Sequence, residues 1–234
     1  MRIWDIDAGY LNDKSLLGEH RELHGIISIV CNGKRGYSKH PETLRWSRAL
    51  EGLALRHALL IQEMSLRGFK HQSPLKGLEE KAKWPSIFID EPDRQYKILE
   101  KKYVGKRTGR IPLPNTVYDL WANHKYSIMA RDYNIYKRFG KLVADKKIGF
   151  AELSRRLIPF MRMMPSFGSL TNAIFHMWGY VSRYSPVNPV EIPIDELFEE
   201  LQTLVLIHKV TYLIQSTALG ELAYWTKSVK KNHC

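Results

Sequence analysis

Two groups near the start of the chain can act together in catalysis: the amine of Met1 and the carboxylate of Glu22. An α-amino group has a reference pKa of about 7.7–8.0, against about 10.4 for lysine, so roughly a tenth of it is neutral and nucleophilic near pH 7. Imine formation on a sugar aldehyde carbon requires such an amine beside a carboxylate that moves protons. We therefore interpret Met1 and Glu22 as catalytic candidates.

A short segment and a helix must position this pair. Residues 2–10 alternate apolar and acidic side chains, which predicts an extended or turn segment that pins the N-terminus against the core, although termini usually fray. Asn12 or Asp13 can cap a helix, and its apolar stripe has helical spacing: Leu16, His20, Leu23, Ile27 and Val30. Glu22 flanks this stripe, and its spacing alone favours an ordinary surface acid over a catalytic one.

His20 and His24 stand four residues apart and can in principle share a metal ion. The sequence has no third ligand at zinc-site spacing and no His-Glu-x-x-His motif. We therefore expect packed or half-exposed histidines, no metal and no cofactor.

A basic turn follows at residues 32–41, where two glycines let the backbone approach a ligand closely. Its cations can grip phosphates and its tyrosine can stack on a base. The nucleic-acid candidates in this turn are Lys34, Arg35, Tyr37, Lys39 and His40. The alternative interpretation is a charged loop between two helices.

The net charge of +12 indicates a polyanionic partner, with nucleic acid ahead of an acidic membrane. Residues 91–150 contain 14 Lys and Arg against 6 Asp and Glu, so this quarter of the chain holds +8 of the surplus. Such a concentration favours a binding strip over a uniformly basic surface, and a solvated linker is the alternative. Within it, Lys106, Arg107, Lys125, Arg138 and Lys141 are nucleic-acid candidates.

The chain predicts an all-α fold, because strand alternation is nearly absent and helical spacing recurs. A helix is expected from Pro41 to about residue 66, with a break or bend at Gly52. Prolines punctuate the middle of the chain, so we expect three parts: a catalytic domain at 1–75, a basic connector at 76–115 and a helical nucleic-acid-binding domain at 116–234.

Cys31 and Cys234 are the only cysteines, which excludes a disulfide framework and indicates a reducing, cytoplasmic location. Acidic residues at positions 5 and 7 argue against a signal peptide. No apolar run approaches the roughly 20 residues of a membrane span, so no membrane partner is expected.

The first 75 or so residues resemble the pyrimidine-dimer DNA glycosylase family. The resemblance rests on four pieces: Met1-Arg2-Ile3, Glu19-His20-Arg21-Glu22-Leu23, the turn from Asn32 to Pro41, and Arg67-Gly68-Phe69. It implies an all-helical fold and a dual activity, in which the N-terminal amine attacks C1′ of the damaged nucleotide, forms an imine and cuts the strand by β-elimination. Carried over, Met1 supplies the amine, Glu22 is the acid–base, and Arg2 and Arg21 hold phosphates.

The sequence departs from the phage member of that family at three places. The phage enzyme begins with a small residue exposed by removal of methionine, whereas the bulky Arg2 predicts that Met1 is retained. Ser15 replaces a histidine of the phage motif, and Gly25 replaces a DNA-contacting arginine. Selectivity for dimers is the property that the last two departures affect.

Residues 119–225 resemble a second family, a helical domain of bacteria and archaea that is often fused to a desulfidase acting on thiolated uracil or thiouridine. The matching pieces include His124-Lys125-Tyr126, the run from Tyr136 to Ala144, Asn172 with His176, and Glu221-Leu222. This resemblance implies RNA or tRNA binding.

The expected function is a DNA repair glycosylase with apurinic/apyrimidinic (AP) lyase activity on damaged duplex DNA. The alternative is an RNA- or tRNA-binding protein, or a tRNA-modification accessory factor, that lacks glycosylase chemistry. A basic scaffold for a repair complex is a third, weaker interpretation. A pure binder has no need of both the amine and Glu22, which favours the enzyme.

Overall fold

A computed structural model describes residues 1–231, with side chains to residue 228, and Cys234 therefore lies outside it. Within residues 1–231 the regular structure is helical and contains no strand, which confirms the all-α prediction. The elements of the first half are η1 (Ala8–Tyr10), α1 (Asp13–Cys31), α2 (Pro41–Trp46), α3 (Leu50–Leu66) and α4 (Pro92–Lys102). The remaining elements are α5 (Val117–Met129), α6 (Tyr133–Ala144), α7 (Phe150–Met161), α8 (Phe167–Trp178), η2 (Ser182–Tyr184), α9 (Ile194–Ile207), α10 (Thr211–Ile214) and α11 (Ala218–Lys231).

The chain folds into two compact units, Met1–Gly109 and Arg110–Cys234. The division falls within the segment 76–115 that the sequence analysis treats as a connector. Its larger part, with α4, packs into the first unit, because Tyr96 meets Tyr10 edge-on at 5.1 Å and the Tyr103 hydroxyl accepts a 2.9 Å hydrogen bond from the Asn12 backbone. Most of this segment is therefore a packed part of the first unit, although it contains several prolines.

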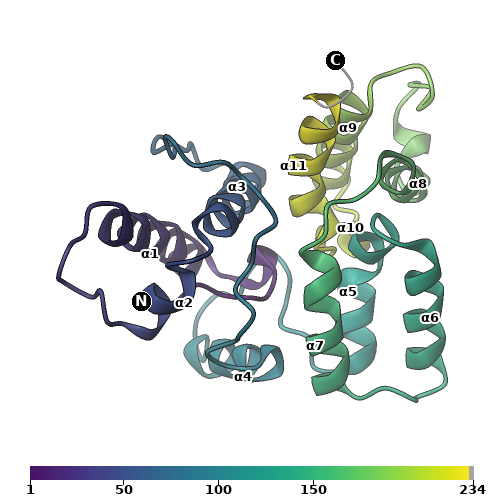
Figure 1. The fold of residues 1–234 in the computed structure, drawn as a ribbon. Coiled ribbons are helices and arrows are strands. Elements are labelled where there is room, and N and C mark those ends of the chain that lie inside the picture. Colours follow the sequence, from purple (N-terminus) through teal and green to yellow (C-terminus); the bar gives the residue numbers. More distant parts are fainter. Residues whose placement is uncertain (232–234) are drawn as a thin grey trace. The chain divides into compact units, whose positions relative to one another are not determined.

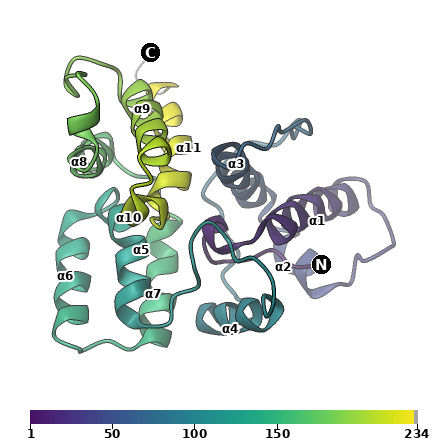
Figure 2. The ribbon, with the colours of Figure 1, turned by 180° about the vertical axis from the view of Figure 1, so that it is seen from behind.

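In the first unit, α1 and α3 lie side by side and α2 lies against α1 (Figures 1 and 2). Asn12 caps α1, and its side chain accepts a hydrogen bond from the Ser15 backbone, as its residue type predicts. The buried face of α1 includes Leu16, Leu23 and Ile26. This packing fixes the direction in which the polar side chains on the rest of α1 point.

The expected single helix after Pro41 is two helices, and its break lies at residues 47–49 instead of at Gly52. Gly52 sits inside α3, where the backbone of Lys83 crosses so closely that an added Cβ would lie 2.7 Å from the Lys83 carbonyl carbon. The glycine therefore permits a close approach of two backbone segments and does not bend the helix.

In the second unit, α5 is central and packs against α6, α7, α8 and α11. Its capping box joins Thr116 and Asp119. At its other end, the buried Arg131 pairs with both carboxylate oxygens of Glu221 on α11, at 2.5 and 2.8 Å. Arg131 also donates to backbone carbonyls before α8, so it joins three parts of the unit.

No helix among the described residues is both long and apolar enough to cross a membrane.

Candidate active site

The N-terminal segment is held by side chains at four consecutive backbone positions. The N–H groups of residues 2 to 5 each donate to a side-chain oxygen of a different residue, and the three longer contacts measure 2.9 to 3.3 Å. The acceptors, in the order of their donors, are Glu22, Glu42, Glu19 and Gln95. The predicted pinning of the N-terminus is therefore present, and α1, α2 and α4 each contribute to it.

This arrangement places the Met1 amine beside two functional groups. Its nitrogen lies 3.4 Å from Oε2 of Glu22 and 3.5 Å from Nε2 of His40. Glu22 is half exposed, with 39% of its side chain accessible, whereas the Met1 side chain is 12% exposed. The amine thus has a carboxylate that can take its proton, and that carboxylate is open to solvent and substrate.

The hydrogen bond on the other ring nitrogen decides which tautomer of neutral His40 faces the amine. Nδ1 of His40 accepts from the backbone N–H of Glu42 at 3.2 Å, where it caps α2. A neutral imidazole with Nδ1 as acceptor carries its proton on Nε2. That Nε2–H can donate only to a neutral amine, which is the nucleophilic form. His40 is therefore placed to act on Met1, a position that differs from the phosphate or base contact expected of the turn.

Two further carboxylates beneath the segment serve as anchors. Glu19 is buried and takes two hydrogen bonds from Arg56, at 2.9 and 3.0 Å. Burial raises the pKa of Glu19, and Arg56 offsets this in part. Glu42 lies 3.0 Å from Nε of Arg45 and its pKa is also raised by burial, against the opposing charge of Arg45.

A cleft of about 230 Å³ opens beside the amine's carboxylate partner. Glu22 and Glu19 line it together with three cations. The cleft therefore has the candidate catalytic carboxylate on one part of its lining and positive charge that attracts phosphates on another. The full lining is Arg2, Trp4, Lys14, Ser15, Gly18, Glu19, Glu22, Ile98 and Lys102. Ser15, which stands where the phage motif has a histidine, therefore lines this cleft.

Arg2 and Arg21 take different places. The Arg2 guanidinium pairs with Asp90 at 2.7 Å and lies 5.0 Å from the ring centre of Trp4, at the edge of the cleft. Arg21 is exposed on α1. Gly25, where the phage motif has an arginine, has open space around it, because an added Cβ would meet nothing within 4 Å.

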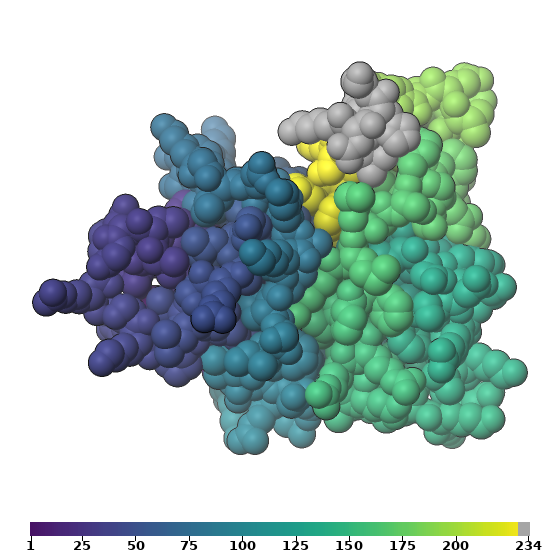
Figure 3. Space-filling view, viewed as in Figure 1, coloured from purple at the N-terminus to yellow at the C-terminus, as the bar shows by residue number. Residues whose placement is uncertain are grey.

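The basic turn lies on the surface of the first unit between α1 and α2, in the dark violet and blue part of Figure 3. Tyr37 is 70% exposed, which suits stacking. Lys34 donates to the hydroxyl of Ser28 at 2.7 Å, while Arg35 and Lys39 are exposed.

Lys106 and Arg107 are exposed after α4, in the first unit. The carbonyl of Arg107 accepts a 3.1 Å hydrogen bond from the Asn12 side chain, so their backbone is fixed next to the start of α1.

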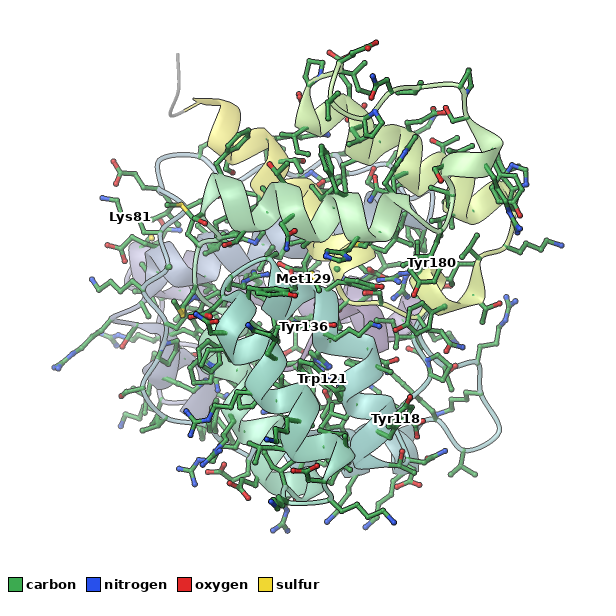
Figure 4. All side chains as sticks on the ribbon, turned by 90° about the vertical axis from the view of Figure 1, so that its right-hand side faces the viewer. Lys81, Tyr118, Trp121, Met129, Tyr136 and Tyr180 are labelled. Atoms are coloured by element: carbon green, nitrogen blue, oxygen red, sulfur yellow. The ribbon has the colours of Figure 1, made fainter. Side chains whose placement is uncertain are left out.

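The remaining candidates belong to the second unit. Lys125 lies 4.8 Å from the ring centre of Tyr126 and 4.6 Å from that of Tyr212, and Tyr212 stacks on Tyr180 at 5.3 Å. Figure 4 shows Tyr180, with Tyr118 and Tyr136, among the helices of this unit. Arg138 and Lys141 are exposed on α6.

Sequence reasoning missed Lys14 and Lys102 as cleft residues, and Glu42 and Gln95 as anchors. Lys102 stands in the basic run, but nothing in its spacing relates it to Glu22, which is on another helix. The signal for Glu42 was only its position at the start of a helix that begins with proline. Tertiary packing brings these groups to the N-terminus.

The anchored amine, the carboxylate beside it and the basic cleft are the features expected of an imine-forming enzyme that acts on nucleic acid. Residues 1–77 match the family model for pyrimidine dimer DNA glycosylase. This match supports a DNA repair function of the glycosylase type for the first unit, Met1–Gly109.

Residues 125–188 match a second model, described as protein of unknown function (DUF1722). The two matches confirm the two-part resemblance found in the sequence. No curated protein and no solved structure gives a significant match.

Proposed function

We propose that the first unit is a DNA glycosylase with AP lyase activity on damaged duplex DNA, in which the Met1 amine is the nucleophile. One observation carries the proposal: the amine lies 3.4 Å from the Glu22 carboxylate while the next four backbone N–H groups are bound by side chains. Holding a chain terminus this firmly orders groups that would otherwise fray, and an amine that must reach one carbon atom benefits from that order.

The reaction proceeds by exchange at C1′. The amine nitrogen bonds to C1′ as the bond from C1′ to the base breaks, and the base leaves with a proton. The nitrogen lone pair then expels the ring oxygen, which takes a proton, and the product is a protonated imine. Loss of a proton from C2′ expels the 3′ phosphate and cuts the strand. Water finally hydrolyses the imine and restores the free amine.

Glu22 accepts the proton that the amine loses and returns protons to the ring oxygen, since its oxygen is the nearest carboxylate to the amine and is open to the cleft. His40 donates from Nε2, 3.5 Å away, to the neutral amine. The target nucleotide or its partner must leave the base stack for C1′ to reach the amine. The cations at the cleft, Arg2, Lys14 and Lys102, hold the flanking phosphates.

Borohydride trapping tests the proposal. Untagged protein, with Met1 verified by mass, is reduced in the presence of duplex DNA that contains either a thymine dimer or an abasic site. We expect a covalent adduct that maps to the Met1 peptide with both duplexes. Acetylation of the terminal amine should abolish the adduct while DNA binding stays within about twofold.

Glu22→Gln and a matched control separate the carboxylate's role from charge effects. The variant keeps an oxygen for the Arg2 backbone and should slow adduct formation on dimer DNA by about 10²–10⁴-fold. Glu80→Gln, which changes an exposed acid of the same unit, should react as the wild type does. Adduct on abasic DNA alone would indicate a lyase without dimer selectivity. No adduct on either duplex, with DNA binding intact, would refute the proposal.

The second unit has a specific observation in favour of nucleic-acid binding. Tyr180 and Tyr212 stack on each other and are 43% and 37% exposed, and the cation of Lys125 lies 4.6 Å from the centre of the Tyr212 ring. Exposed aromatic rings beside a lysine can stack on unpaired bases and pair with phosphates. We take single-stranded segments of RNA, such as those of tRNA, as the second candidate ligand.

Tyr180→Ala should weaken tRNA binding by the full-length protein about tenfold, since stacking on one base is worth about 1–3 kcal/mol. Phe167→Ala, another exposed aromatic residue of this unit, is the control and should bind as the wild type does. Equal affinities of the wild type and the two variants for tRNA would exclude the surface around Tyr180 and Tyr212 as the contact.

A further inference from the structure

Four histidines converge between two helices and the following loop of the first unit. His20 and His24 are one turn apart on α1, His57 is buried on α3, and His71 follows α3. The three closest contacts among them join residues 33 to 51 positions apart. Only the pair on α1 has ligand spacing in the sequence, and the fold supplies the other two histidines.

One ring nitrogen of each histidine faces the same point. Nε2 of His57 lies 3.1 Å from Nε2 of both His20 and His24, and Nε2 of His20 lies 3.1 Å from Nε2 of His71. The potential ligand atoms of all four residues lie within 4.8 Å of one another. Four nitrogens around a tetrahedral zinc ion, each at about 2.0–2.1 Å, are about 3.3 Å apart. Three nitrogen pairs of the cluster, each 3.1 Å apart, therefore have nearly the spacing of a tetrahedral site.

Hydrogen bonds between the rings cannot account for all three of the 3.1 Å contacts. Each Nε2 of a neutral imidazole offers either one N–H or one lone pair. His20 and His57 each have two Nε2 neighbours, so the three close contacts cannot all be good hydrogen bonds. A cation at the centre instead accepts four lone pairs at once.

We propose that His20, His24, His57 and His71 form a binding site for a divalent transition-metal ion of the zinc type. Imidazole nitrogen suits zinc and neighbouring late first-row metals. Four protein ligands leave no open position, which is typical of a structural site and not of a catalytic one. None of the four residues lines the cleft beside Glu22.

The protonation state agrees with this role. Burial, together with the neighbouring imidazoles, lowers the pKa of His20 to about 4 and that of His57 to about 3. Both rings are therefore neutral at pH 7, the form that binds a metal ion. The Ser73 backbone acts in the opposite direction on the pKa of both His24 and His57, and burial, the largest cause, outweighs it.

The ion would tie α1 to α3 and to the start of the long loop after α3. Because α1 also carries Glu19 and Glu22, the site would fix the helix that binds the N-terminal segment. Because the ion binds a site that only the folded unit forms, its binding would add to the stability of this unit. This inference does not depend on the proposed reaction.

Metal analysis of the full-length, untagged protein tests the site. Protein freed of metal with a chelator is titrated with Zn²⁺ or Co²⁺ and followed by elemental analysis, visible absorption and thermal unfolding. We expect about one ion per chain, the visible bands of tetrahedral Co²⁺, and an increase in Tm of about 5 °C or more, since a bound ion stabilises only the folded state.

His71→Ala is the preferred variant, because this residue lies outside the helices, and it should retain less than a tenth of the bound metal. His176→Ala, an exposed histidine on α8, should retain all of it. If His71→Ala fails to fold, the wild-type titration decides alone. A wild-type protein that binds no Zn²⁺ at about 10 μM, shows no tetrahedral Co²⁺ bands and keeps its Tm would overturn the proposal.

Discussion

At the scale of single residues, the Met1 amine lies near both Glu22 and His40. The sequence predicted different roles for these two residues. Glu22 was expected as the acid–base and His40 as a nucleic-acid contact. The ring of His40 makes two separate contacts, since Nδ1 caps α2 and Nε2 lies 3.5 Å from the amine. A substitution that keeps the cap therefore isolates the second contact.

His40→Asn should make this separation, because asparagine is a good N-cap but does not reach the amine as the ring does. We expect adduct formation on abasic DNA to slow by about tenfold with little change in Tm. His40→Ala should show the same rate loss and an additional loss of about 1 kcal/mol in stability. Wild-type rates in His40→Asn, measured by single-turnover trapping, would leave His40 with a structural role only.

Acid should weaken the second unit through His124. This ring is buried, Nδ1 contacts the Leu120 carbonyl at 2.8 Å, and burial lowers the pKa of His124 to about 4 against 6.5 for the free residue. The folded state thus takes up the proton less readily than the unfolded state. The stability contribution is complete above pH about 6.5 and is lost as the pH falls through about 4, a change on the order of 3 kcal/mol.

Urea unfolding at pH 7, 5.5 and 4 measures this effect. The His124→Gln variant does not titrate at this position, so its free energy of unfolding should fall less steeply with acid than that of the wild type. Parallel curves for the two proteins would contradict the prediction. The comparison with the variant removes the contributions of other groups that titrate in the same range.

At the scale of elements, α1 has two polar faces with different partners. Glu19 and Glu22 meet the N-terminal segment, and His20 and His24 meet α3 and the loop after it. Because these four residues are one to five positions apart on one helix, their side chains point in different directions around its axis. Their positions therefore depend on how α3 packs, and α3 in turn depends on the close passage of Lys83 over Gly52.

Gly52→Ala should destabilise the first unit. The added methyl group would overlap the backbone carbonyl of Lys83, which cannot move aside as a flexible side chain can, and overpacking of this kind costs about 1–3 kcal/mol or more. Gly25→Ala, in the middle of α1 with open space around it, should instead stabilise by about 0.5–1 kcal/mol. Opposite shifts in Tm would confirm the difference, and equal shifts would contradict it.

At the scale of the whole molecule, the basic segment 91–150 does not belong to a single folded unit. Lys102 borders the cleft of the first unit, whereas Lys125, Arg138 and Lys141 belong to the second. The region of highest charge density thus divides between two compact units, each of which can attract nucleic acid. Binding that is dominated by phosphates should reveal which cations take part through its dependence on salt.

Replacing Lys14 and Lys102 together by glutamine should lower the salt slope for duplex DNA by about 2, since each neutralised phosphate contributes about 0.9. The double variant Lys76→Gln, Lys227→Gln changes the net charge equally but lies outside the cleft, and it should keep the wild-type slope. Affinity for duplex DNA measured at several salt concentrations tests this. Equal slopes for the two variants would exclude the cleft cations as phosphate contacts.

The sequence by itself determined the all-α class, the cap of α1 and the likeness of residues 1–77 to pyrimidine dimer DNA glycosylases, because helical spacing, capping residues and short motifs are local in the chain. It also singled out Met1 and Glu22, which flank the stretch from Arg2 to Arg21 that fits the family without a gap. Tertiary structure alone decided the break at residues 47–49, the inclusion of α4 in the first unit, the place of His40 beside the amine, and the meeting of His57 and His71 with the pair on α1. These features are contacts between residues far apart in sequence, and periodicity carries no information about which distant segments pack together.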